Sequence, residues 1–259
     1  MNTSNLIVIA GNQLRHQYFV NELSAHFSLS AVFVENFEHP DPIFKGNKER
    51  ELRNQFFANR RKTEEQFFGH SKNISTQNKP KFINIKKCFL NHRDTLKIVQ
   101  SFNPGKIVIF GTSLLDSKYL NLYPNCIFNL HVGLSQHYRG SSCNFWPIHD
   151  LRPDLLGATI HYVDKGIDSG EVLNQDTIKL NEDDSEHILM VKTVILGVKL
   201  MIQCINEPGS KLPIKEKQKG NGKLYLMKHF TPQAILKVRQ LVTSGSLRQR
   251  IAKENQIRR

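Results

Sequence analysis

Asn129, His131 and Asp168 are the residues of this sequence best suited to chemistry. The first two are two positions apart in a strand-like stretch, so their side chains face the same side of a sheet. An amide and an imidazole placed together can hydrogen-bond an oxyanion, and the imidazole can also move a proton. Asp168 follows in a loop with two glycines, from which its carboxylate could orient His131 and raise the pKa of its ring. Each feature alone also fits a structural residue.

The elements that must position these residues alternate along the first half of the chain. Short apolar runs predict strands at 6–10, 31–35, 82–85, 106–110 and 125–130, and amphipathic or charged stretches predict helices at 13–27, 47–68 and 92–102. This order predicts an α/β fold, a mostly parallel twisted sheet with helices on both faces. Ligands of such sheets bind at the carboxyl ends of the strands, where residues 129 and 131 lie.

The second half changes character. Residues 158–163 and 171–180 predict a hairpin-like strand pair, and a polar cap at 184–185 begins an apolar helix. We expect a catalytic domain at 1–206 and a small basic extension at 207–259, with a short strand pair and a helix.

The formal net charge of +13 is concentrated in that extension. Residues 211–259 carry 13 Lys and Arg against two acids, a composition that could steer an anionic partner or simply keep the chain dissolved. No apolar run approaches the ~18 residues of a membrane span and no leader pattern is present, so we expect a cytoplasmic protein. The four cysteines lack disulfide or zinc spacing, and no metal is predicted.

Two segments together form a specific pattern. FNLHVGLSQHYRGSSCNFWPIHD (128–150), followed by GATIHYVDKGIDSGEVL (157–173), resembles the folate-dependent formyltransferase family. The shared features are N-x-H, a loop that ends in Y-R-G, and a strand followed by V-D-x-G-x-D-x-G. The family includes enzymes acting on glycinamide ribonucleotide, methionyl-tRNA and amino sugars. The resemblance implies a Rossmann-like formyltransferase core, N10-formyltetrahydrofolate as co-substrate and no metal.

The resemblance also implies roles for the matching residues. Asn129 would hold the formyl oxygen and its oxyanion, His131 would support that oxyanion and relay a proton, and Asp168 would set the state of His131 and accept the proton leaving the amine. The pterin would lie near Ser113, Leu114 and Leu115, in a loop with free backbone groups, under Val163, Asp164 and Gly166. The acceptor is expected to contact Asn12, Arg15, Tyr138, Arg139, Gly140 and Trp146.

The acceptor is predicted from the segments in which this sequence differs from some members of the family and resembles others. Residues 131–136 lack the proline of many relatives, and residues 13–16 replace the glycine-containing phosphate loop of the glycinamide ribonucleotide enzymes. Segments 111–113 and 144–147 look most like the nucleotide-sugar N-formyltransferases. A nucleotide-linked amino sugar is therefore the preferred acceptor. Methionyl-tRNA and glycinamide ribonucleotide are the alternatives, although the roughly 50 residues after the last core helix are fewer than a tRNA-holding domain needs.

Two interpretations from other classes stay open. Cys143 with His131 and Asp168 could form a cysteine hydrolase site, or the chain could be a silent binding protein with a basic tail. The expected partners are the folate and the nucleotide sugar, with nucleic acid disfavoured. Residues 223–227 could form a strand that pairs with a second copy in a homodimer.

Overall fold

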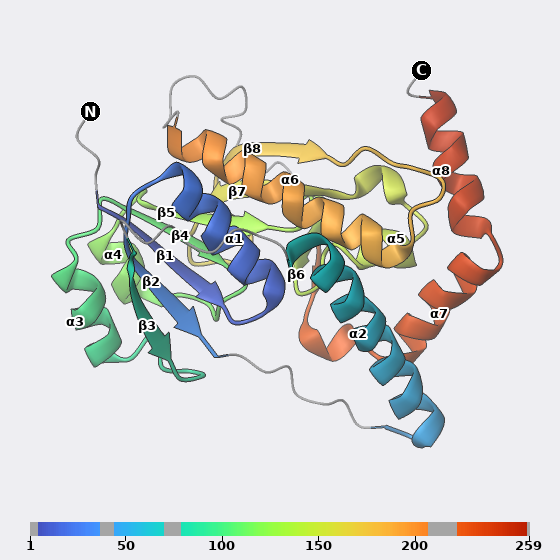
Figure 1. The fold of residues 1–259 in the computed structure, drawn as a ribbon, viewed down its shortest axis with the longest axis horizontal. Helices are drawn as coiled ribbons and strands as arrows, with labels where there is room; N and C mark the ends of the chain where they lie inside the picture. The colour runs from blue at the N-terminus through green and yellow to red at the C-terminus, as the bar shows by residue number, and fades with distance from the viewer. Residues whose placement is uncertain (1–4, 37–43, 70–78, 207–221, 258–259) are drawn as a thin grey trace.

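The computed structural model describes residues 5–36, 44–69, 79–206 and 222–257. At its centre is a seven-stranded sheet of order β3-β2-β1-β4-β5-β7-β8 (Figure 1). Its strands are β1 (Leu6–Gly11), β2 (Leu29–Glu35), β3 (Lys81–Ile85), β4 (Lys106–Phe110), β5 (Ile127–His131), β7 (Gly157–Tyr162) and β8 (Val172–Thr177). The first five are parallel, whereas β7 and β8 are antiparallel to their neighbours. The predicted mostly parallel sheet and the strand pair after it are confirmed.

Helices cover both faces of this sheet because its strands are apolar on both sides. In β1, Val8 packs toward α1 (Leu14–His26) and α6 (Glu186–Asn206), whereas Ile9 packs toward α3 (Arg93–Ser101) and α4 (Ser117–Leu122). Both side chains are fully buried. This is the arrangement expected of a parallel sheet that is covered on two sides.

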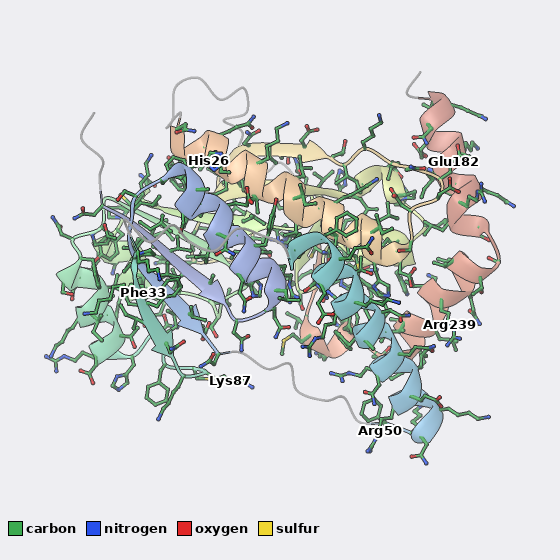
Figure 2. All side chains as sticks on the ribbon, in the orientation of Figure 1. His26, Phe33, Arg50, Lys87, Glu182 and Arg239 are labelled. Carbon is green, nitrogen blue, oxygen red and sulfur yellow. The ribbon has the colours of Figure 1, made fainter. Side chains whose placement is uncertain are left out.

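A third apolar cluster lies beside the sheet and includes the C-terminal helices. It joins α2 (Asn47–Phe68), α5 (Trp146–His149), the first turns of α6, α7 (Pro232–Thr243) and α8 (Ser246–Ile257). Arg239 of α7 also donates a hydrogen bond of 3.1 Å to Gln55 of α2. Figure 2 shows Arg239 and Arg50 on these two neighbouring helices. The described C-terminal residues are therefore attached to the core.

A second, two-stranded sheet connects the C-terminal segment to the loop after β5. β6 (Tyr138–Gly140) pairs in parallel with β9 (Lys223–Tyr225), and a 3-10 turn at Met227–His229 follows. The strand proposed as a dimer edge thus pairs within the chain, and a homodimer stays a prediction. So does the division at 206/207, because residues 207–221 lie outside the described residues.

Among the described helices, α6 alone is long and apolar enough to cross a membrane, although Lys192 and Lys199 interrupt its apolar residues. However, 61% of its most apolar window is buried inside the protein. The helix packs against β7, β8, α1 and α2. Its composition is therefore that of a core helix.

Candidate active site

A cavity of about 390 Å³ opens at the carboxyl ends of β1, β4 and β5. Its wall combines the turn after β1, the loop after β4, the end of β5 and the loop after β7. The first three meet because the strand order brings the carboxyl ends of the parallel strands β1, β4 and β5 together, and such edges are where α/β sheets bind ligands. The loop after the antiparallel β7 reaches the same space through Asp168, which lies 3.1 Å from Asn129 and 3.3 Å from His131. The volume lies within the ~300–1,000 Å³ that small-molecule sites occupy.

The three predicted catalytic side chains converge in this cavity. The amide nitrogen of Asn129 lies 3.1 Å from Oδ1 of Asp168, and Nδ1 of His131 lies 3.3 Å from Oδ2 of the same carboxylate. Asn129 and His131 project from one face of β5, as their spacing predicts, and Asp168 reaches them from the loop after β7. An amide, an imidazole and a carboxylate therefore border one space.

Both ring nitrogens of His131 face oxygen atoms. Nε2 lies 2.9 Å from the backbone oxygen of Tyr138, which can only accept, so a neutral ring carries its proton there. Nδ1 then presents a lone pair toward Asp168. Burial lowers the pKa of His131, while the charge of Asp168 acts in the opposite direction. The geometry favours a neutral ring that can take up a proton at Nδ1, where the carboxylate would stabilise the resulting cation.

Asp168 stays charged despite its burial. Burial alone would raise its pKa, but the positive charge that His131 and His161 carry when protonated, together with the N–H of Gly140, holds the pKa well below its usual range. Gly140 donates that hydrogen bond over 2.8 Å. Asp168 has φ +48, a left-handed conformation that Asp and Asn tolerate better than most residues. The loop is thus shaped to hold a carboxylate here.

His161 is a fourth polar residue of the site, and it was not predicted from the sequence. It lies opposite Asn129 in the β5–β7 ladder and is 3% exposed. Its Nδ1 donates to the carbonyl of Tyr162 over 2.8 Å, which leaves Nε2 to accept from the amide of Asn129 over 3.0 Å. His161 therefore fixes which way that amide points. The alternation of residues 157–162 could have indicated it, had the antiparallel pairing with β5 been known.

The residues predicted to hold the folate all line the cavity. They are Ser113, Leu114, Leu115, Val163, Asp164 and Gly166. The expectation of free backbone groups in the first loop is wrong at two positions. The fully buried Glu35 accepts hydrogen bonds of 2.7 Å from both the N–H and the hydroxyl of Ser113, and Asn91 donates to the carbonyl of Leu114. Glu35 therefore fixes the shape of this loop.

We predict that Glu35→Gln raises the KM for the formyl donor about tenfold or more. The amide keeps the volume but presents an N–H group to a donor of Ser113, and a lost hydrogen bond to a charged group costs ~1.5–3 kcal/mol. Steady-state kinetics with varied donor measure this change. Glu182→Gln, at an exposed site on another part of the molecule (Figure 2), is the matched control. An unchanged donor KM in Glu35→Gln would contradict the role.

Three of the six residues predicted to contact the acceptor line the cavity, and three do not. Asn12, Arg15 and Gly140 line the cavity. Tyr138, Arg139 and Trp146 are not among the lining residues. Tyr138 and Trp146 are buried and stack with Tyr225, and Arg139 donates to the carbonyl of Gly222 over 3.0 Å. These three support the C-terminal segment.

A cationic cluster borders the cavity at the start of α1. Arg15 donates to Glu64 over 3.0 and 3.3 Å, and Arg60 of α2 donates to the same carboxylate over 3.0 Å. Both arginines line the cavity, and two guanidinium groups share one carboxylate. Burial and the neighbouring charge of Arg60 lower the pKa of Arg15 to about 10. The cluster keeps an excess positive charge that an anionic ligand would balance.

Cys143 lacks the features of a nucleophile. It is 1% exposed and not among the lining residues, and its thiol donates to the carbonyl of Gly140. Burial and the charge of Asp168 raise its pKa well above the ordinary value, whereas a nucleophilic cysteine needs a lowered one. The geometry therefore argues against the cysteine hydrolase interpretation.

Comparisons with known proteins identify the family of the chain. The family model described as formyl transferase matches residues 57–205. The curated methionyl-tRNA formyltransferase of Thermodesulfovibrio yellowstonii is 29% identical over 113 residues, which are 43% of this chain and 36% of that protein. The chain spans less than half the length of the first curated relatives it matches.

Solved structures share the fold at low sequence identity. A sugar N-formyltransferase from Shewanella sp. has a TM-score of 0.55 and 14% identity, covering 90% of this chain and 87% of its own. The formyltransferase PseJ from Anoxybacillus kamchatkensis, in complex with a UDP-linked formamido sugar and tetrahydrofolate, has a TM-score of 0.50 and 16% identity, with 90% and 97% covered. The phosphoribosylglycinamide formyltransferase of Anaplasma phagocytophilum has a TM-score of 0.53 and 16% identity, with 78% and 88% covered.

Proposed function

Because this chain belongs to the formyl transferase family, we propose that it transfers a formyl group from N10-formyltetrahydrofolate to the amino group of a nucleotide-linked amino sugar. The observation that carries this proposal is the convergence of Asn129, His131 and Asp168 in one cavity. Each of these groups suits one requirement of acyl transfer to an amine.

The proposed chemistry assigns one task to each side chain. The folate supplies the formyl carbon, and the acceptor amine attacks it directly. The amide N–H of Asn129 donates to the formyl oxygen as negative charge develops there. Asp168 takes the proton that the amine loses, directly or through water, and Nδ1 of His131 can receive it in turn. The proton finally reaches the departing folate nitrogen, so the products are the acceptor with its amine converted to a formamide group, and tetrahydrofolate.

The cavity suits a folate beside the catalytic groups. Leu114, Leu115, Val163 and Ile167 provide apolar surface around it, and Leu114 is 63% exposed at its edge. A flat heterocycle could bury this surface. Backbone groups of the loop that Glu35 holds would supply its polar contacts.

The charge at the other side of the cavity supports a phosphate-bearing acceptor. Arg15 and Arg60 present their guanidinium groups beside the N-terminus of α1, where the helix dipole also favours an anion. The diphosphate of a nucleotide sugar fits this chemistry. PseJ, whose fold this chain shares, is described with a UDP-linked formamido sugar.

Two other acceptors compete within the family. The curated relatives are named methionyl-tRNA formyltransferases, and a phosphoribosylglycinamide enzyme shares the fold. The two amino-sugar enzymes cover 90% of this chain, whereas the phosphoribosylglycinamide enzyme covers 78%. This difference supports the sugar, because the two amino-sugar enzymes align with a larger share of this chain.

The test is to incubate the protein with N10-formyltetrahydrofolate and a panel of acceptors: nucleotide-linked amino sugars, glycinamide ribonucleotide and methionyl-tRNA. The proposal expects a mass gain of about 28 Da, one formyl group replacing a hydrogen, on one amino sugar. Loss of this product in His131→Ala would tie it to the site. Formylation of methionyl-tRNA or glycinamide ribonucleotide alone would contradict the proposed acceptor.

We predict that Arg15→Ala raises the acceptor KM at least about tenfold, since hydrogen bonds to charged groups contribute ~1.5–3 kcal/mol. Its loss also leaves Glu64 to neutralise Arg60. The effect should disappear for a free amino sugar without the nucleotide. Arg61→Ala, an exposed residue of α2 paired with Glu65, is the control. An equal effect on both acceptors would show that Arg15 does not bind phosphate.

A further inference from the structure

The described C-terminal segment 222–230 borders the cavity, although it lies far along the sequence from the other residues that line it. Tyr225, Leu226 and Met227 are among the cavity-lining residues. They follow the core by about 20 residues, and the family model ends at residue 205. The segment therefore adds a wall that the matched family region does not contain.

Backbone pairing fixes this segment beside the catalytic carboxylate. The N–H of Lys223 donates to the carbonyl of His137 over 2.8 Å, and the N–H of Ser141 donates to the carbonyl of Tyr225 over 2.7 Å. Between them lies Gly140, whose own N–H donates to Asp168. A Cβ atom on Gly140 would lie 2.2 Å from the carbonyl oxygen of Tyr225, so only glycine allows the approach. The wall and Asp168 are thus held by the same short strand.

Tyr225 anchors the segment through its side chain. Its ring stacks on Trp146 at a centroid distance of 4.1 Å, and its hydroxyl donates to Asp150 over 3.1 Å. This anchor also explains why Trp146 is buried instead of facing a ligand. Because Tyr225 is anchored in this way, the next two residues, Leu226 and Met227, are held at the cavity.

Leu226 and Met227 are partly solvent-exposed apolar residues that border the cavity. Leu226 is 39% exposed and Met227 is 37% exposed. Two adjacent exposed apolar side chains at the edge of a polar site are a surface that a ligand would bury favourably.

Leu226 and Met227 line the same cavity as Arg15 and Arg60. Phe230, three residues after Met227, packs against Phe56 and Phe57 of α2 at centroid distances of 5.7 and 5.8 Å. Arg60 is one helical turn after these phenylalanines. The segment therefore contacts α2 one turn before Arg60, which is proposed to bind phosphate. Its strand β9 pairs with β6, and Gly140 of β6 donates a hydrogen bond to Asp168.

We infer that Leu226 and Met227 determine acceptor specificity by contacting the C–H face of the amino sugar ring between Arg60 and Asp168. This inference rests on the proposed function. A sugar held at its phosphate by arginines and at its amine by Asp168 must cross the space that these two side chains border. Apolar contact there favours a ring face with few hydroxyl groups.

The test compares Leu226→Ala and Met227→Ala with the wild-type chain, using the acceptor that the panel identifies. Losing an apolar contact of this size should raise the acceptor KM about 10-fold or more, while the KM of the formyl donor changes less than about twofold. Leu236→Ala, exposed on α7 and outside the cavity lining, is the matched control. Leu226→Met and Met227→Leu should restore most of the affinity.

Several outcomes overturn the inference. An acceptor KM equal to that of the control, or a donor KM that rises as much as the acceptor KM, would show that this wall does not select the acceptor. Thermal melting of each variant separates unfolding from lost contact, and where one alanine variant unfolds the other one decides. If no panel member is formylated, the proposed function fails. Direct titration with 5-formyltetrahydrofolate then decides, because weaker binding in both alanine variants would assign the wall to the folate.

Discussion

Asp168→Asn is expected to lower kcat by about 10²- to 10⁴-fold, the contribution of a positioned general base. The substitution removes the proton acceptor and the negative charge that stabilises a cationic His131. It keeps the side-chain shape, and Asn is as compatible as Asp with the φ of +48 at this position. The loss should therefore reflect the missing charge and not a distorted loop. Initial rates under saturating donor and acceptor measure it.

The pH dependence of stability provides an independent readout for this variant. The folded protein holds the pKa of Asp168 well below its usual range. Its charge therefore stabilises the fold above the ordinary carboxyl pKa of ~3.9, and that contribution is lost as the pH falls toward the folded value. Asp168→Asn should lack this contribution, so its unfolding free energy should depend less on pH in the acidic range.

Asp176→Asn, at an exposed position on β8, is the control for charge removal elsewhere. It should retain wild-type turnover. A turnover of Asp168→Asn within about tenfold of wild type, with the fold intact, would contradict the assignment of Asp168 as the proton acceptor.

The parts of the fold that could be predicted from sequence are those fixed by local pattern. β4 lies at 106–110 and α2 at 47–68 as predicted, because a continuous apolar run or a long helical pattern needs no partner to be identified. The short elements β6, α4 and α5, of three to six residues, were missed. Their residues form no period long enough to detect, and contacts such as Trp146 on Tyr225 determine them.

The residues of the site that could be predicted are likewise those that a local sequence pattern identifies. Asn129 and His131 could be identified because two residues on one strand share a face, and Asp168 because its motif is specific. His161 and Glu35 escaped detection because their roles depend on pairing between distant segments, β5 with β7 and β2 with the loop after β4. The cavity wall at Tyr225–Met227 likewise depends on a strand pair separated by about 85 residues in sequence.

Asn129→Ala is expected to lower kcat by about 10²- to 10³-fold, the usual cost of removing one oxyanion donor. In the structure the amide donates to Asp168 and to His161, and a formyl oxygen gaining charge would become the stronger acceptor. Because that contact forms mainly in the transition state, KM values should change by less than about threefold. Asn174→Ala on β8, whose amide donates to Gln203 over 3.2 Å away from the cavity lining, should keep full activity.

A double variant separates this role from a purely positioning one. If Asn129 served only to orient Asp168, adding Asn129→Ala to Asp168→Asn would cause no further loss, because the group it orients is already absent. If the amide holds the oxyanion, the double variant should be slower than Asp168→Asn by at least about tenfold. Equal rates of the single and double variants would therefore reassign Asn129 to positioning, and the oxyanion would require another donor in this cavity.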